Sequence, residues 1–161
     1  MTDRQPEIAR GHEVPFATQF SVFLANRVGQ LKDLLDLAAR EKLDLYAVSI
    51  IDSTDWAVIR TIFSDVDKAR EILRRNGIPF TESEVLLAEL PEEDSLSQIC
   101  GILLSGEISV HFAYPLTIRS HDYPVMVFHV DDTVLATQML MKHGFVLLGQ
   151  EDLGDSGFQQ S

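Results

Sequence analysis

Apolar and polar residues along the first half of the chain follow two periods in turn. Residues 19–24 alternate, with Phe20, Val22 and Leu24 on one side, which predicts a strand. Residues 30–42 predict a helix whose acidic and basic residues lie opposite an apolar face of Leu31, Leu34, Leu35 and Ala38. The same reasoning predicts strands over residues 43–51 and 56–63, a long strand or two strands in tandem over residues 78–90, and helices over residues 30–42 and 66–75.

The second half repeats this order of elements. Residues 85–90 can open it, as a strand shared with or continuous from the last strand of the first half. A helix over residues 96–105, strands over 108–118 and 123–130, a helix from 133 to about 142 and a strand over 145–148 follow. We therefore expect an α+β protein of two ferredoxin-like βαββαβ modules, each an antiparallel sheet with its helices on one face. The expected divisions are a flexible tail over 1–15, domains over 16–84 and 85–153, and a flexible tail over 154–161.

Turns and caps recur at equivalent places in the two halves. The helix over residues 66–75 can be capped by Ser64-Asp65 and can end in a left-handed turn at Asn76-Gly77. The equivalent helix of the second half can be capped by Asp131-Asp132 and can end in the same way at His143-Gly144. Ser95 is expected to cap the first helix of the second half. Because the helix starts and stops both repeat, they support a duplicated module.

The second expected strand is apolar on both faces. Leu45 and Ala47 should face one way, and Tyr46, Val48 and Ile50 the other. A sheet with helices on one side needs only one apolar face. A neighbouring module, a partner chain or both should therefore cover the second face, and we expect a homodimer.

The charge of the chain limits its partners. Its 25 acidic and 13 basic residues give a formal net charge of -12, which disfavours nucleic acid and anionic membrane surfaces. No segment reads as a signal peptide or membrane span, and Cys100 is the single cysteine, expected to be buried on one helical stripe with Leu96, Ile99 and Leu103. A cytoplasmic setting is the default expectation.

The segment from Asn26 to Leu31 leaves a strand and enters a helix. The first amides of that helix lack intrahelical partners and, with the helix dipole, can hold a carboxylate. Gly29 would allow close backbone approach, and Asn26 and Arg27 could add hydrogen bonds. A plain turn glycine is the alternative interpretation. The candidate ligand-binding residues are Asn26, Arg27, Val28, Gly29, Gln30 and Leu31.

The residues of this segment resemble a known family. Residues 20–31, FSVFLANRVGQL, followed by a leucine-rich helix and by LDLY at residues 43–46, look like the opening of an ACT domain, and residues 89–114 resemble a second copy. The resemblance implies a regulatory protein that binds an amino acid where two domains meet. Because the sequence shows no catalytic motif, we expect no catalytic residues and no cofactor. The resemblance also implies possible partners among biosynthetic enzymes, because such modules include the regulatory subunit of acetolactate synthase.

Two departures from the family pattern bear on the sites. Val28 stands where a proline is usual, and Asp94 stands where the second copy would carry its glycine. Glu92, Glu93, Asp94 and Ser95 form a possible second site that could bind an ammonium group or a weakly held cation, or could be a solvated turn.

Other functions have less support in the sequence. His111, His121, His129 and His143 lack the spacing of a metal site, and no phosphate loop or nucleophile motif is present. The remaining alternatives are a small enzyme on this fold and a structural dimerisation module without a ligand.

Overall fold

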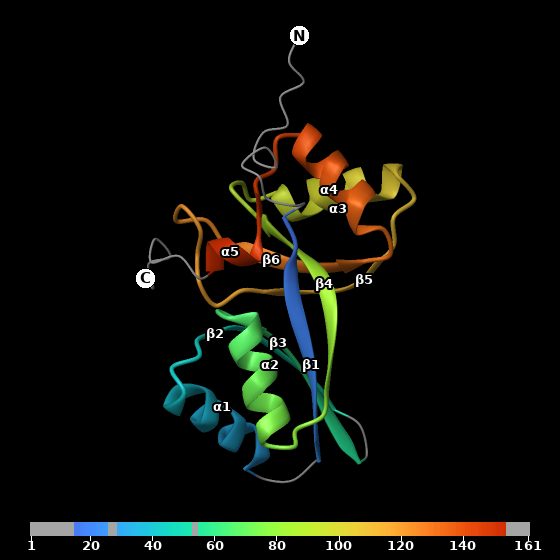
Figure 1. Ribbon diagram of the computed structural model, residues 1–161. Helices are drawn as coiled ribbons and strands as arrows, with labels where there is room; N and C mark the ends of the chain where they lie inside the picture. Colours follow the sequence, from blue (N-terminus) through green and yellow to red (C-terminus); the bar gives the residue numbers. More distant parts are fainter. Residues whose placement is uncertain (1–14, 26–28, 53–54, 154–161) are drawn as a thin grey trace.

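The structure is a computed structural model that describes residues 15–25, 29–52 and 55–153 (Figure 1). Both expected tails and the segment Asn26–Val28 fall wholly or mostly outside the described residues. The elements in chain order are β1 (Ala17–Ala25), α1 (Gln30–Arg40), β2 (Leu45–Asp52), β3 (Trp56–Phe63), α2 (Val66–Arg75), β4 (Phe80–Glu89), α3 (Ser95–Ser105), β5 (Val110–Pro115), β6 (Val125–Val130), α4 (Thr133–Lys142), β7 (Leu147–Leu148) and α5 (Gln150–Leu153).

Strand β4 belongs to both halves of the molecule. The strands are antiparallel in the order β2-β3-β1-β4-β6-β5, and β7 pairs with β4 on the edge opposite β6. Residues 80–85 of β4 pair with β1, whereas residues 86–89 pair with β6. One uninterrupted strand therefore closes the first βαββαβ module and opens the second. The predicted α+β fold of two ferredoxin-like modules is confirmed, while a domain boundary at residues 84 and 85 stays a prediction because it falls inside β4.

Three apolar layers follow from this topology. Figure 1 shows α1 and α2 at one end of the molecule and α3 and α4 at the other. Each helix pair covers the outer face of its own sheet, over cores that contain Phe20 and Leu73 in the first module and Ile99 and Phe128 in the second. A third core joins the inner faces of the two sheets. Its buried members are Ala17, Tyr46, Ala47, Ile62, Val85, Leu87, Tyr114, Leu116, Ile118, Val125, Val127, Leu148 and Leu153. The neighbouring module thus covers much of the second apolar face.

The expected alternation of β2 is wrong, because a bulge interrupts it. The register against β3 shifts between Leu45 and Ala47. As a result Tyr46 and Ala47 both belong to the core between the sheets, whereas Leu45 and Val48 pack towards the helices. A β-bulge places an extra residue against the partner strand and re-aims the side chains around it.

Two expected helix faces are also partly wrong. Leu35 of α1 is 38% exposed, and the buried residues of that helix are Leu34 and Ala38. In α3 the buried residues are Ser95, Ile99 and Leu103, while Leu96 is 38% exposed and Cys100 is exposed. Each helix lies at an end of the molecule and buries a stripe narrower than its sequence suggests.

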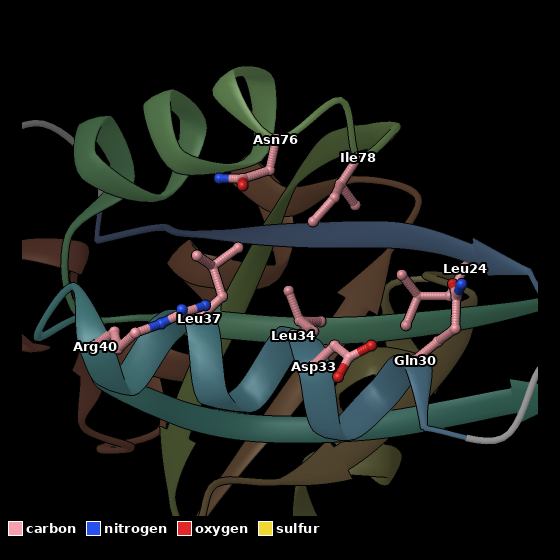
Figure 2. Close-up of a pocket in the computed structure, with 8 residues that line it drawn as sticks. All are labelled: Leu24, Gln30, Asp33, Leu34, Leu37, Arg40, Asn76 and Ile78. Carbon is pink, nitrogen blue, oxygen red and sulfur yellow. The ribbon is translucent and has the colours of Figure 1, made fainter.

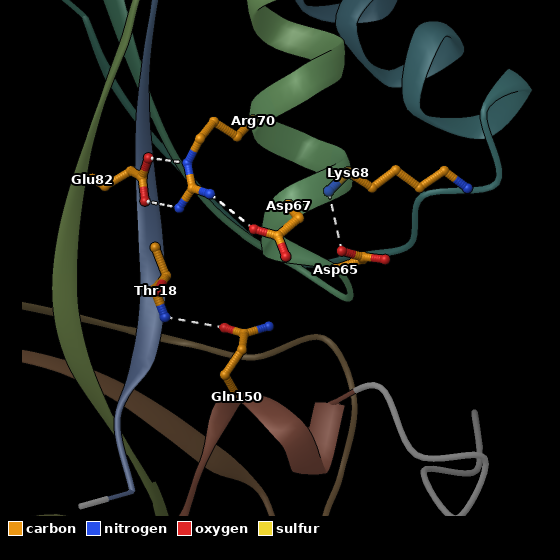
Figure 3. Close-up of polar contacts among 7 residues, drawn as sticks. All are labelled: Thr18, Asp65, Asp67, Lys68, Arg70, Glu82 and Gln150. Atoms are coloured by element: carbon orange, nitrogen blue, oxygen red, sulfur yellow. Dashed lines mark hydrogen bonds and ion pairs between the residues drawn. The ribbon is translucent and has the colours of Figure 1, made fainter. Parts of the chain in front are cut away.

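The helix α2 follows its predicted caps closely. The Asp65 carboxylate accepts a hydrogen bond from the Lys68 backbone N–H at 3.1 Å (Figure 3), and the chain turns out of the helix at Gly77, with φ of 67°. Arg70 then fastens the helix to β4, because its guanidinium donates to both carboxylate oxygens of Glu82 at 2.8 Å. The cap of α4 is equivalent, since the Asp132 side chain accepts from the Leu135 N–H.

The C-terminal segment binds the two modules together. Gln150 starts the short helix α5, which the sequence pattern did not predict. Its side-chain oxygen accepts from the Thr18 N–H at 3.0 Å, as Figure 3 shows, and its side-chain nitrogen donates to the Phe63 carbonyl at 3.0 Å. One amide side chain from the second half thus satisfies backbone groups on two strands of the first.

Candidate functional site

The predicted junction between β1 and α1 has the backbone conformation that calls for glycine. Gly29 occupies the N-cap position of α1 with φ of 94° and ψ of -15°. Residues with a side chain rarely adopt a positive φ of this size, whereas glycine adopts it freely. A Cβ atom built on Gly29 would meet nothing within 4 Å among the described residues. The requirement for glycine is therefore conformational, and the space beside its Cα is open.

The N-terminus of α1 has no side-chain cap in the part of the chain that the structure describes. Gly29 lacks a capping side chain, and no side chain accepts a capping hydrogen bond at this end. The first amides of a helix need partners from outside the helix, and water or an anion can serve. Asp33 lies in the first turn and already contributes some favourable charge there.

A groove begins at this end of α1 and runs between α1 and the turn from α2 to β4 (Figure 2). Its volume is about 280 Å³, near the lower end of the range of ligand pockets. Four residues are apolar and four are polar: the groove is lined by Leu24, Gln30, Asp33, Leu34, Leu37, Arg40, Asn76 and Ile78. Figure 2 shows Asn76 and Ile78 facing α1 from across the groove.

The groove carries both signs of charge over an apolar floor. Asp33 can accept from an ammonium group, and Arg40 can donate to a carboxylate. The Asn76 side chain is held in place, because its nitrogen donates to the Ile72 carbonyl at 2.8 Å, which leaves its oxygen to accept from a ligand. Such a groove suits a small zwitterion with an apolar side chain.

The structure brings together only part of the predicted site. Gly29 and Gln30 lie at the junction, and Gln30 lines the groove, whereas Leu31 packs against the core of the first module. Asn26, Arg27 and Val28 lie outside the described residues. The sequence analysis missed Asp33 and Arg40, although both recur at helical spacing from Gln30. It also missed Asn76 and Ile78, which reach the groove only through the fold.

The possible second site is a closed turn. Glu92, Glu93 and Asp94 are exposed, and Ser95 is buried. Contrary to the prediction, Ser95 does not cap α3: it is the first helical residue, and its hydroxyl accepts from the Glu92 N–H at 2.8 Å. Asp94 holds the N-cap position with φ of -97°, an ordinary value for a residue with a side chain. The geometry thus favours the interpretation of a solvated turn.

A buried carboxylate occupies the neighbouring end of β4. Glu89 is 3% exposed, accepts a hydrogen bond from the Ser120 hydroxyl and lies 2.7 Å from His121 Nδ1. Both partners come from the connection between β5 and β6, where His121 has a φ of 52°. β4 opens the second module as β1 opens the first, so this network lies at the position equivalent to the end of β1. The sequence analysis missed Glu89, whose signal was an acidic residue closing an otherwise apolar run.

Metal binding gains no support within the described ranges. No group of three or more His, Cys, Asp or Glu side chains there could hold a metal ion. His143 Nδ1 lies 2.8 Å from the Met139 carbonyl at the end of α4, where a helix C-terminus favours a basic group.

Comparison with known proteins identifies the family. The model of the ACT domain pair matches residues 16–156, so the chain belongs to that family. No curated protein sequence matches the chain. A protein from Bacteroides thetaiotaomicron of known crystal structure has a TM-score of 0.77 and 24% identity, with 87% of this chain and 96% of that chain covered.

The regulatory subunit of aspartate kinase from Thermus thermophilus shares the fold at lower similarity. Its ligand-free structure has a TM-score of 0.54 and 8% identity, with 81% of this chain and 94% of that chain covered. Membership of the ACT domain pair family supports a regulatory, ligand-binding role. In the described part of the chain no helix is long and apolar enough to cross a membrane.

Proposed function

We propose that this chain binds a free amino acid at the junction of β1 and α1 and transmits its presence to a partner. The observation that carries this proposal is the left-handed Gly29 at the open end of a groove lined by Asp33 and Arg40. The ligand carboxylate is expected to meet the first amides of α1, and its ammonium group is expected to meet an acceptor in the groove. Asn26, Arg27 and Val28 belong to the proposed site by their place in the sequence. The proposed setting is the cytoplasm.

The affinity for a zwitterion can be estimated from the hydrogen bonds that its carboxylate and ammonium groups would form. Charge-assisted hydrogen bonds contribute about 1.5–3 kcal/mol each. Two or three of them, less the cost of ordering the ligand, give a micromolar dissociation constant, about -8 kcal/mol. This affinity would let the protein respond to changes in a metabolite pool.

A regulatory subunit of an amino-acid biosynthetic enzyme, such as acetolactate synthase, is the second candidate function. The structural similarity to a protein described as the regulatory subunit of aspartate kinase favours this class. Capture of a large catalytic partner by the tagged full chain would distinguish it from a protein that acts alone. A structural dimerisation module is the third candidate, and it predicts no response to any amino acid.

A thermal-shift screen against the twenty amino acids tests the proposed function. A ligand that binds only the folded state stabilises it by RT ln(1 + [L]/Kd), which is about 2.7 kcal/mol at a hundredfold excess over Kd. We expect one amino acid, or a chemically related few, to raise the melting temperature by several degrees in a dose-dependent way. Equal and small responses to all twenty would leave the proposal without support and favour the structural module.

We further propose that the protein is a homodimer joined through α3. This helix contains no acidic or basic residue, and Leu104 on it is 76% exposed, whereas the chain as a whole has a net charge of -12. Leu104→Glu should raise the dimer dissociation constant at least tenfold, as measured by sedimentation velocity. Val146→Glu adds the same charge at an exposed residue outside α3 and should leave the dimer intact. Equal effects of the two variants would exclude this surface.

A further inference from the structure

Four side chains form a column at the edge of the core between the two sheets. The Arg60 guanidinium carbon lies 3.5 Å from the centre of the Phe112 ring. On the other side of that ring lies the His129 ring, with ring centres 4.7 Å apart and an interplanar angle of 6°. The His111 ring centre lies 5.2 Å from that of His129. The order along the column is therefore Arg60, Phe112, His129 and His111.

The column joins the two modules. Arg60 is half-buried on β3 of the first module. Phe112 and His129 are paired residues on β5 and β6 of the second module, and β5 is an edge strand. A guanidinium is attracted to the negative face of an aromatic ring, and more strongly where water is partly excluded. The contact between Arg60 and Phe112 therefore fastens an edge strand of the second module to the first.

The buried side of the His129 ring cannot take a proton without cost. Its Nδ1 atom is buried and has no hydrogen-bond partner in the described structure. A neutral imidazole carries one N–H and can leave the buried nitrogen bare, whereas an imidazolium carries an N–H on both nitrogens. Protonation would thus place a charged donor where no acceptor lies, and an unsatisfied charged group costs more than a neutral one.

The charges that face His129 also oppose its protonation. His111 faces it from β5, and Arg60 faces it from β3 beyond the Phe112 ring. Burial lowers the pKa of His129, and the positive charges of His111 and Arg60 lower it further. Tyr114, which stacks on Phe112, brings no charge, because burial raises the pKa of its hydroxyl.

The nearest carboxylates do not offset these charges. Asp131 follows β6, and its carboxylate is occupied by the Ser109 N–H at 3.1 Å. The buried Glu89 lies opposite Val125, at the other end of β6. Neither carboxylate contacts the His129 ring in the described structure. A proton on His129 therefore has no local counter-charge among the described residues.

We propose that the column is a pH-dependent latch between the modules, closed while His129 is neutral and released when His129 takes up a proton. The charged imidazolium repels Arg60 through the ring that lies between them. β5 then loses its attachment to β3, whereas the shared strand β4 and the core between the sheets keep the modules joined. The latch requires no amino acid and is independent of the proposed ligand site.

The latch should make the protein less stable on mild acidification. A histidine with a folded pKa below its unfolded value of about 6.5 stabilises the fold above that value, and this contribution is lost as the pH falls through the folded value. The melting temperature should therefore fall by several degrees between about pH 7.5 and about pH 5.5. His129→Phe keeps a ring on Phe112 but takes no proton, so it should fall less. His143→Phe removes an exposed histidine outside the column and should keep the full wild-type loss.

Proton magnetic resonance of the full chain tests the release itself. The Arg60 Cδ protons adjoin the guanidinium that lies over the Phe112 ring, so the ring current should shift their signal upfield while the latch is closed. As the pH falls, this signal should move to an ordinary position with the same midpoint as the Cε1–H signal of His129. That midpoint should lie below about 6.5.

Variants then test the coupling along the column. Arg60→Gln should raise the midpoint of His129, because one repelling charge is removed. Arg119→Gln removes an exposed arginine bound to the Asp122 carbonyl and should leave the midpoint unchanged. If His129→Phe does not fold, His129→Gln replaces it as the variant that takes no proton. An Arg60 signal that stays in place while His129 titrates, a His129 midpoint at or above about 6.5, or a full wild-type loss of stability in a folded His129 variant would overturn the proposal.

Discussion

Gly29→Asp should abolish the rise in melting temperature that the cognate amino acid produces, while Gly29→Asn should retain part of it. Both variants replace a glycine at φ of 94° with side chains of nearly equal size that tolerate left-handed conformations better than most. Each should lose about 1–2 kcal/mol of stability from backbone strain. Only aspartate also places a negative charge where the ligand carboxylate is expected.

The expected difference between these variants is large because the charge acts at short range. Losing one charge-assisted hydrogen bond costs about 1.5–3 kcal/mol, roughly a tenfold to hundredfold loss of affinity, and repulsion adds to it. Isothermal titration calorimetry with the amino acid found in the screen would measure this difference. Equal affinities of the aspartate and asparagine variants would show that the carboxylate does not bind at the N-terminus of α1.

Local patterns in the sequence predicted several helix caps and turns of the fold. The turn at Gly77 and the helix caps at Asp65 and Asp132 each depend on a few neighbouring residues, so they could be predicted from the local sequence alone. Gly29 was readable for the same reason. The conformation that the structure gives it agrees with a role that only glycine fills without strain.

Features that depend on residues distant in the sequence could not be predicted from local patterns. The bulge that places Tyr46 beside Ala47 is defined by the register against β3. The exposure of Cys100 depends on how much of α3 its neighbours cover. Arg40 and Asn76 meet across a groove only because α1 and α2 lie side by side on the same sheet.

The core between the sheets has a functional consequence for any regulatory role. Ligand binding at one module can influence a partner only if the two states of the protein differ in free energy when the ligand is bound. Here the modules share β4, pack through a common core and are tied by Gln150. We therefore expect them to fold and respond as one unit rather than as two independent domains.

Leu87→Ala should cost about 2–5 kcal/mol of unfolding free energy, the usual range for a buried leucine. Leu87 is 0% exposed, lies on the shared strand and belongs to the core between the sheets. Its removal should lower the denaturation midpoint of both modules together. Urea unfolding followed by fluorescence of Trp56, the single tryptophan, and by far-ultraviolet circular dichroism would give coincident curves.

Leu103→Ala is the matched control, because Leu103 is also a leucine, is 1% exposed and lies on α3, where it belongs to the core of the second module only. Trp56 lies on β3 of the first module. If the modules unfold as one, this distant change must still move the fluorescence midpoint by as much as it moves the circular dichroism midpoint. A fluorescence midpoint that stays at the wild-type value in Leu103→Ala would mean that the first module unfolds independently. The shared strand would then be a covalent link between separate sensors and not a route for coupling.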